Sequence, residues 1–234
     1  MKLERVSSSV HRIGLGFVNA YLIEGGDDLT VVDTGMPGSE AKIVAAIQEL
    51  GRAPSDVGRI LLTHLHYDHT GSANALRESV DAPVVMHPAD AAALRDGLLA
   101  RDFRPAPRLW ARMMAVSMRG IAHTTEPISV EEEVTDGQVM GEAADARVVH
   151  VPGHAAGQIA LLLPEDGGVL IAADAASRFF RLDYPPIFED LELGRESLVR
   201  LSQESFRIAC FGHGRPIRDD AAAAFARRFG GSGG

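Results

Sequence analysis

The sequence is that of an acidic chain of 234 residues, with a hydrophobic content of 46% and a formal net charge of −9 at pH 7. The length is ordinary for a layered α/β fold, and the hydrophobic content is ample for a large core. The negative charge argues against an extended nucleic-acid surface, which requires clustered lysine and arginine. A single cysteine, Cys210, excludes an intrachain disulfide and fits a reducing cytoplasm.

No targeting or membrane-spanning segment is apparent in the sequence. Residues 1–9 contain no apolar core of signal-peptide length, and no run approaches the roughly 18 apolar residues of a membrane span. We therefore expect a cytoplasmic protein without membrane partners. Residues 230–234, Gly-Gly-Ser-Gly-Gly, look like an appended linker, so a single folded domain is expected over residues 1–229.

The first predicted elements are two strands joined by a turn. Residues 19–33 follow the order strand, turn, strand, aspartate, and the turn contains glycine and aspartate, which tolerate the positive φ that hairpins require. A helix is expected next, with Ser39 placed to cap it and Gly51 to end it. Its apolar face is formed by Ile43, Val44, Ile47 and Leu50.

The apolar run at residues 59–62 indicates a buried strand that leads directly into Thr-His-Leu-His-Tyr-Asp-His. On an extended chain, residues two apart point the same way, so His64 and His66 can bind one ion together. Asp68 and His69 follow after the chain turns and are placed for a second ion. Because neutral imidazole and carboxylate suit zinc and related first-row metals, this motif predicts a metal site.

The segment Leu98–Pro127 does not follow the alternation of strand and helix. Residues at roughly helical spacing follow two prolines, namely Leu109, Met113, Val116 and Met118. We expect a helical insertion that either packs on its own domain or forms an apolar lid over the metals. The loop after Asp174 is similarly aromatic. The side chains expected around a substrate are Trp110, Met114, Phe179, Phe180 and Tyr184.

Residues 158–174 repeat the plan of residues 19–33, again as strand, turn, strand and aspartate. A helix and a buried strand then lead to His213, as they lead to His64 in the first half. Two such halves, each a sheet with its helices outside, predict an α/β fold in the form of a four-layer αββα sandwich.

Three further candidate ligands each follow an apolar run. His154 comes after a Pro-Gly pair, Asp174 ends the run that begins at residue 168, and His213 lies between two glycines. A ligand at the carboxyl end of a strand sits on a rigid element and faces an edge that all the strands share. Flanking glycines let the backbone turn sharply beside an ion.

These motifs together resemble the metallo-β-lactamase superfamily, and within it the glyoxalase II-like and lactonase-like dinuclear hydrolases. The resemblance rests on HxHxDH at residues 64–69, His154 in PGHxxG, Asp174, His213 in GHG and Asp33 in DTG. It extends over nearly the whole chain and implies the αββα fold. It also implies two divalent metal ions, zinc above all, with iron or manganese as alternatives.

The resemblance implies a role for each ligand. One ion takes His64, His66 and His154, the other takes Asp68, His69 and His213, Asp174 bridges the two, and Asp33 orients the ligand loop.

Two positions depart from the usual pattern of the superfamily. A glycine usually precedes the bridging aspartate, where this chain has Ala173, and a threonine usually follows the PGH motif, where it has Ala155. Neither departure removes a ligand. Both affect residues around the ligands, which commonly tune metal affinity and activity.

The remaining histidines are interpreted as structural. His87 follows a short strand, and His150 lies in strand alternation before the PGH turn, so neither is expected to bind metal. His11 lies near the first hairpin, whereas His123 lies in the insertion and is a candidate for the pocket. Cys210 is interpreted as a small buried hydrophobe.

The reaction that the resemblance implies is hydrolysis of a small-molecule substrate. Two neighbouring ions lower the pKa of a shared water, and the resulting hydroxide attacks a carbonyl carbon or a phosphorus. Asp174 would fix the distance between the ions and Asp68 would orient the nucleophile, so these two are the expected catalytic residues. The leading substrate class is a carboxylic thioester, ester or lactone.

Several alternatives stay open. Promiscuous phosphotriester or phosphodiester cleavage fits an open dinuclear site. β-Lactam hydrolysis is disfavoured because β-lactamases lack a bridging aspartate at the position of Asp174. The chain after His213 is too short for the glutathione-binding domain of long glyoxalase II enzymes. The same ligand set occurs in mononuclear iron persulfide dioxygenases, and binding without turnover is a further alternative. The oligomeric state stays open between monomer and homodimer.

Overall fold

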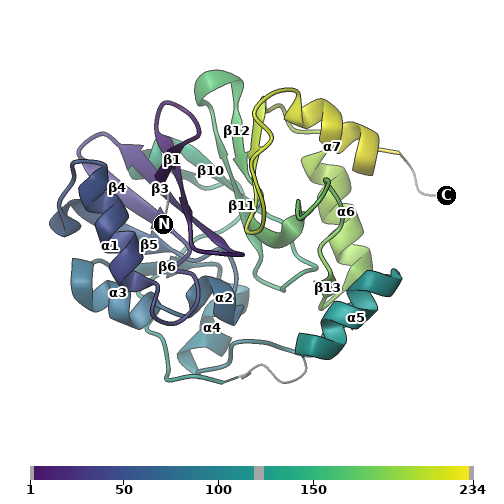
Figure 1. The fold of residues 1–234 in the computed structure, drawn as a ribbon, viewed down its shortest axis with the longest axis horizontal. Coiled ribbons are helices and arrows are strands. Elements are labelled where there is room, and N and C mark those ends of the chain that lie inside the picture. The colour runs from purple at the N-terminus through teal and green to yellow at the C-terminus, as the bar shows by residue number, and fades with distance from the viewer. Residues whose placement is uncertain (1–2, 119–123, 232–234) are drawn as a thin grey trace.

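A computed structural model describes residues 3–118 and 124–231 of the chain. Two β-sheets stack face to face, and helices cover the outer face of each (Figure 1). In spatial order the first sheet contains β1 (Leu3–Arg5), β2 (Val10–Gly14), β3 (Asn19–Gly25), β4 (Asp28–Val32), β5 (Val57–Leu61), β6 (Val84–Met86) and β8 (Glu132–Glu133). The second contains β14 (Ile208–Cys210), β12 (Val169–Ile171), β11 (Ile159–Leu163), β10 (Ala146–His150) and β9 (Val139–Met140).

The helices divide between the two outer faces and the edge where the strands end. The principal helices are α1 (Glu40–Glu49), α2 (Tyr67–Thr70), α3 (Ala73–Val80), α4 (Pro88–Arg95), α5 (Leu109–Met118), α6 (Leu191–Leu201) and α7 (Ala221–Phe229). Single turns of 3₁₀-helix are η1 (Pro54–Asp56), η2 (Gly141–Ala143), η3 (Glu165–Gly167) and η4 (Ala173–Ala175). Within the described residues, no helix has the length and apolar character needed to cross a membrane.

Three apolar layers hold the four structural layers together. Side chains such as Leu61 and Leu161 meet between the two sheets. Ile47 from α1 packs in the layer under the first sheet, and Phe225 from α7 packs in the layer under the second. The order helix, sheet, sheet, helix confirms the predicted αββα sandwich.

The predicted internal repeat is present. β3 and β4 form an antiparallel hairpin, and β11 and β12 form its counterpart. β4 then pairs in parallel with β5, and β12 pairs in parallel with β14. Gly26 and Gly168 have φ of 66° and 93° in the two turns, the left-handed conformation that glycine adopts without a steric cost. The parallel pairs bring the residues after β4, β5, β12 and β14 to corresponding edges of the two sheets.

The helix after the first hairpin follows the prediction except at its cap. α1 begins at Glu40 and buries Ile43 and Ile47, as the apolar spacing indicated. Ser39 stands at the cap position, but its side chain makes no capping hydrogen bond. The reason is its backbone, which is already helical with φ of −91° and ψ of −12°, whereas a capping residue is normally extended.

The insertion predicted at residues 98–127 contains a short strand and a helix. β7 (Arg104–Pro105) pairs antiparallel with β13 (Ile187–Phe188), and α5 follows. A bridge between Leu98 and Thr124 joins the two ends of the insertion. His123, the candidate for the pocket, lies outside the described residues.

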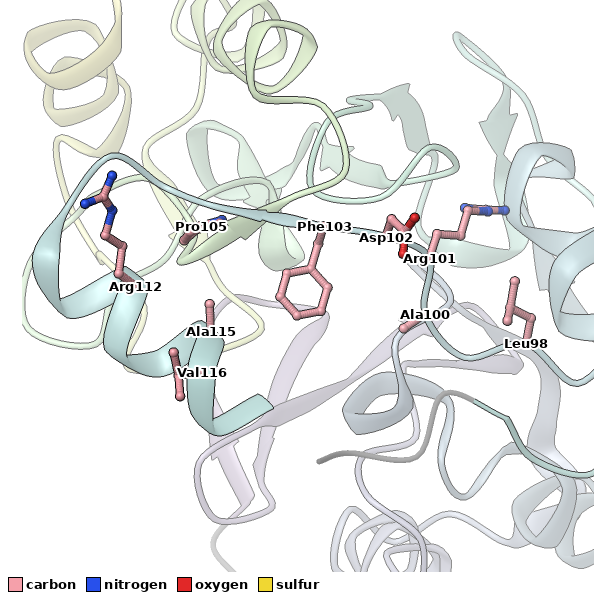
Figure 2. Close-up of a pocket in the computed structure, with 9 residues that line it drawn as sticks. All are labelled: Leu98, Ala100, Arg101, Asp102, Phe103, Pro105, Arg112, Ala115 and Val116. Carbon is pink, nitrogen blue, oxygen red and sulfur yellow. The ribbon is translucent and has the colours of Figure 1, made fainter. Parts of the chain in front are cut away.

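Over residues 109–116, α5 buries two alanines and exposes several of its larger side chains. Ala111 and Ala115 face inward, whereas Leu109 and Met113 are 76% and 68% exposed. A cavity of about 790 Å³ lies between α5 and the segment before it, with Phe103 among the side chains that line it (Figure 2).

Candidate metal centre

The structure brings all seven predicted ligands to one edge of the two sheets. His64 and His66 follow β5, Asp68 and His69 lie in α2, His154 lies between β10 and β11, Asp174 follows β12, and His213 follows β14. Their nitrogen and oxygen atoms form three overlapping groups, each within 4.8 Å: His64, His66 and His154; His64, His69 and Asp174; and Asp68, His69 and His213.

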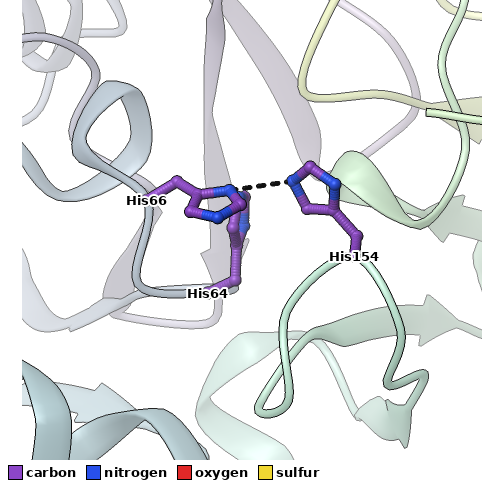
Figure 3. A group of neighbouring side chains, drawn as sticks. All are labelled: His64, His66 and His154. Carbon is purple, nitrogen blue, oxygen red and sulfur yellow. Dashed lines mark hydrogen bonds between the residues drawn. The ribbon is translucent and has the colours of Figure 1, made fainter. Parts of the chain in front are cut away.

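The first group consists of buried, neutral imidazoles (Figure 3). His154 donates its Nδ1 proton to the carbonyl of Ile187 at 3.0 Å, so its Nε2 carries a lone pair, which accepts a hydrogen bond from His66 Nδ1. That Nε2 lies 2.9 Å from His66 Nδ1. Burial, reinforced by the neighbouring His154, lowers the pKa of His66 to about 3. These imidazoles are therefore neutral at physiological pH, the form that binds metal.

The group formed by Asp68, His69 and His213 places a carboxylate between two imidazoles. His213 donates from Nδ1 to the carbonyl of Phe17 at 2.8 Å, and its Nε2 lies 3.3 Å from Asp68 Oδ2. Burial alone would lower the pKa of His213, but the carboxylates of Asp174 and Asp68 raise it to about 10. Burial would raise the pKa of Asp68, and His69 and His213 instead lower it to about 2. This part of the site therefore has the charge pattern of a cation site.

Asp174 lies between the three-histidine group and the group formed by Asp68, His69 and His213. One of its carboxylate oxygens, Oδ2, is 3.6 Å from His154 Nε2 and 3.1 Å from His213 Nε2. The other, Oδ1, is 3.6 Å from His69 Nε2. A carboxylate in this position can contact an ion held by either group, as the bridging role implied by the resemblance requires.

Asp33 stabilises the loop that carries the predicted ligands through contacts with Thr63 and His69. Its Oδ1 accepts a hydrogen bond from the Thr63 amide at 2.8 Å, and its Oδ2 accepts from the Thr63 hydroxyl at 2.9 Å. The same Oδ2 lies 2.8 Å from His69 Nδ1. When His69 donates this proton, its Nε2 is free and faces the cluster, which is how a carboxylate fixes the tautomer of a ligating histidine.

The backbone around the ligands is unusually tight. A Cβ on Gly212 would lie 2.0 Å from Asp174 Oδ1, so only glycine fits before His213. Ala173, which replaces the glycine usual in the superfamily, has φ of 44°. An alanine in this left-handed region costs about 1–2 kcal/mol. The chain therefore keeps the backbone turn ahead of Asp174 at some conformational cost.

The polar atoms of the cluster fit a divalent metal. Within the described residues, the buried atoms that lack a hydrogen-bond partner include Nε2 of His64, His66 and His69, and Oδ1 of Asp174. Leaving such atoms unsatisfied costs about 1–3 kcal/mol each. Their lone pairs converge on a common space, so a cation bound there would compensate the whole set.

A cavity of about 440 Å³ opens directly onto the ligands. Its lining consists of Phe17, Met36, His66, Tyr67, Asp68, Leu99, Ala100, Phe103, Met114, His154, Asp174, Phe179, Pro186, Ile187 and His213. Of the five side chains expected around a substrate, Met114 and Phe179 line this cavity. Phe17 and Met36 were not anticipated, because they come from loops that show no periodic pattern. Leu99 and Phe103 were not named individually, although they lie in the insertion predicted at residues 98–127.

Three of the predicted substrate-contacting residues lie elsewhere. The described lining of the cavity does not include Trp110, Phe180 or Tyr184. Phe180 is fully exposed, and Trp110 is 39% exposed. Tyr184 instead packs against Phe229, with its ring beneath Arg228. For Phe180 the reason is the alternation of side chains along the loop. Phe179 turns inward to stack on His213, so the neighbouring Phe180 turns outward.

His87 and His150 lie outside the three ligand groups. They stack on each other with ring centroids 4.0 Å apart. His87 accepts a hydrogen bond from the Ala89 amide at the start of α4. His150 contacts the carbonyl of Ala156 at 2.9 Å.

The family model that matches the chain is that of the metallo-beta-lactamase superfamily, over residues 13–213. The chain belongs to this superfamily. Among its relatives, the uncharacterized protein YobT of Bacillus subtilis is 29% identical over 68% of this chain and 61% of its own length. An N-acyl homoserine lactonase from a Bacillus species is 26% identical over 82% of this chain and 79% of its own length. The chain spans 61% of the length of YobT and 52% of the length of the lactamase-like protein aptB of Emericella nidulans, so it matches only part of these two relatives.

The fold of the superfamily is also evident in solved structures. BJP-1, a subclass B3 metallo-beta-lactamase of Bradyrhizobium japonicum, superposes with a TM-score of 0.75 at 19% identity. The match covers 97% of this chain and 89% of that one. The cluster of histidines and aspartates thus lies in a metallo-beta-lactamase fold.

Proposed function

We propose that the chain is a dinuclear metallohydrolase that cleaves neutral carboxylic thioesters, esters or lactones with an apolar acyl group. Zinc is the metal that best suits its imidazole and carboxylate ligands. One ion would be held by His64, His66 and His154, the other by Asp68, His69 and His213, with Asp174 shared. The relationship to an N-acyl homoserine lactonase supports this substrate class.

The observation that carries the proposal is the character of the cavity above the ligands. Its lining includes Phe17, Leu99, Phe103, Met114 and Phe179, and no lysine or arginine is among the described residues that line it. A carboxylate or phosphate on the substrate would enter this apolar space without a cationic side chain to pair with, which is unfavourable. The cavity therefore favours a neutral acyl group.

Bound divalent ions would supply a hydroxide near neutral pH and polarise the carbonyl oxygen of the substrate. The side chains of the protein would position the nucleophile and the substrate. Asp68 would share the second ion with His69 and His213, so its carboxylate would lie beside the reacting centre, where it can orient the nucleophile by accepting a hydrogen bond. Phe179 stacks on His213 and lines the cavity, where it would limit water on that side and contact the acyl group.

The test is a substrate panel on zinc-loaded protein, with metal-stripped protein as the control. N-acyl lactones, neutral esters and thioesters should be cleaved with higher kcat/KM than β-lactams and phosphoesters, and activity should disappear with the metal. Preferential cleavage of a β-lactam or a phosphoester would contradict the substrate class. Oxygen consumption by a protein purified with a single iron would support the persulfide dioxygenase alternative instead.

A further inference from the structure

A buried carboxylate outside the ligand set touches the backbone of the first ligand loop. Asp90 lies in the first turn of α4 and is fully buried. Its Oδ2 accepts a hydrogen bond from the amide of Leu65 at 3.1 Å. Leu65 separates the ligands His64 and His66, so this bond acts at the centre of the HxH pair.

The same carboxylate touches the loop that carries the third histidine. Asp90 Oδ1 accepts a hydrogen bond from the Gly157 amide at 2.9 Å, three residues after His154. A Cβ on Gly157 would lie 2.6 Å from Asp90 Cγ, so glycine is what allows the carboxylate to come this close. Asp90 thus joins two loops that are far apart in the sequence and that together hold the three imidazoles of one metal group.

An arginine from the insertion completes this arrangement. Arg101 donates to Asp90 Oδ1 at 2.6 Å and to the carbonyl of Ala89 at 2.7 Å. It also contacts Glu189, at 3.3 Å. Glu189 in turn accepts a hydrogen bond from the Ala156 amide, next to Gly157, at 2.8 Å. The two carboxylates and one guanidinium form a mostly buried network, in which each carboxylate holds a backbone amide of the His154 loop.

Arg101 belongs to the segment that walls the substrate cavity. Leu99, Ala100 and Phe103, its neighbours in sequence, line the cavity over the metals. Ala100 and Phe103 also line the adjacent cavity of Figure 2, so this segment separates the two spaces. The guanidinium therefore fastens the cavity wall to the carboxylate that holds the ligand loops.

We propose that Asp90 and Arg101 are positioning residues that couple the three-histidine metal group to the wall of the substrate cavity. Asp90 sets the distance between the two loops that carry His64, His66 and His154. Arg101 links Asp90 to residues 99–103, so the position of this wall segment depends on the position of those loops. The proposal rests on the metal-binding part of the proposed function. It does not depend on which substrate is cleaved.

The first test is Asp90→Asn, which keeps the size of the side chain. An asparagine offers one acceptor oxygen, so its NH₂ group must face one of the two backbone amides that the carboxylate accepts. We expect the zinc affinity of one of the two metal groups to fall by about 10- to 100-fold, measured by competition with a chromophoric chelator. Hydrogen exchange at the amides of Leu65 and Gly157 should accelerate.

The second test measures the effect of Arg101 on the cavity wall, independently of the ligand loops. Arg101→Met removes the guanidinium while keeping an unbranched side chain. We expect faster amide exchange across residues 99–103, partly restored in Arg101→Lys. Arg95→Met is the matched control, because Arg95 lies on α4, the helix that carries Asp90, and binds the carbonyl of Val130 and the carboxylate of Glu133, away from the metals. It should leave zinc affinity and exchange at residues 99–103 unchanged.

A folded Asp90→Asn protein that binds both zinc ions with wild-type affinity, with unchanged exchange at Leu65 and Gly157, would overturn the proposal. If Asp90→Asn does not fold, Arg101→Met decides, and unchanged exchange in residues 99–103 rejects the coupling. Since these readouts need no turnover, failure of the protein to hydrolyse esters would leave the outcome interpretable.

Discussion

At the scale of the residue, three of the predicted ligand imidazoles are oriented by what one of their ring nitrogens touches. His69 faces Asp33, and His154 and His213 donate to the carbonyls of Ile187 and Phe17. The sequence indicated the ligands because HxHxDH has a distinctive spacing. It could not indicate the carbonyl partners, since any residue supplies a carbonyl and only the folded loops determine which one is near.

The charge of the second metal group leads to a prediction about protons. Carboxylates raise the pKa of His213 to about 10 and that of His69 well above its usual range, although burial opposes both shifts. His213 is therefore protonated on both ring nitrogens at pH 8 in metal-free protein and must lose one of these protons to bind an ion. Zinc binding should release protons, and zinc affinity should rise with pH up to about pH 10.

Calorimetric titration in two buffers of different ionisation enthalpy measures this release. A binding enthalpy that is independent of the buffer, together with a zinc affinity that does not change between pH 7 and pH 9, would show that these histidines are already neutral.

The backbone at Ala173 gives a second prediction at this scale. Its φ of 44° suits glycine, so Ala173→Gly should remove strain. We expect the free energy of unfolding of the zinc-loaded protein to rise by up to about 1 kcal/mol, since the greater flexibility of glycine in the unfolded chain offsets part of the gain. Urea denaturation provides the measurement.

Ala172→Gly is the control, because Ala172 has ordinary helical angles, with φ of −78°. That variant should lose about 0.5–1 kcal/mol. If both variants lost stability equally, the left-handed conformation of Ala173 would not be a source of strain.

At the scale of the element, strands and helices were easier to predict than the loops between them. The apolar runs located β5, β12 and β14, and the spacing of Ile43 and Ile47 located the buried face of α1. The cavity wall was only partly predicted, because aromatic composition does not reveal which of two neighbours turns inward. Asp90 was missed for a similar reason, as nothing near it in the sequence shows that two distant loops will meet at its carboxylate.

The neighbouring pair Phe179 and Phe180 tests this view of the loop. Phe179 lines the cavity, whereas Phe180 points to solvent. Phe179→Ala should change the ratio of kcat/KM between long and short acyl substrates by about tenfold, close to the 1–3 kcal/mol per methylene that apolar pockets supply. Phe180→Ala should leave that ratio unchanged. Equal effects of the two substitutions on every substrate would mean that this loop does not determine specificity.

At the scale of the whole molecule, hydrogen bonds join the first half of the chain to the loop that carries His213 in the second half. Tyr21 of β3 donates its hydroxyl proton to the carbonyl of Phe211 at 2.7 Å, and Asn19 donates to the carbonyls of Phe211 and Gly214. These bonds join the first hairpin to the loop that carries His213. The internal repeat was enough to predict two facing sheets, but the hydrogen bonds between the halves depend on their packing and not on any local pattern.

The measurement that tests the account most directly is the metal content of purified protein. Wild-type protein and His87→Ala should each hold close to two zinc ions per chain, because His87 lies outside the ligand groups. Asp174→Ala should hold fewer and lose hydrolysis together with metal, because the carboxylate between the two groups is gone. One ion per fully loaded wild-type chain, with His213 turned away from it, would contradict the dinuclear centre.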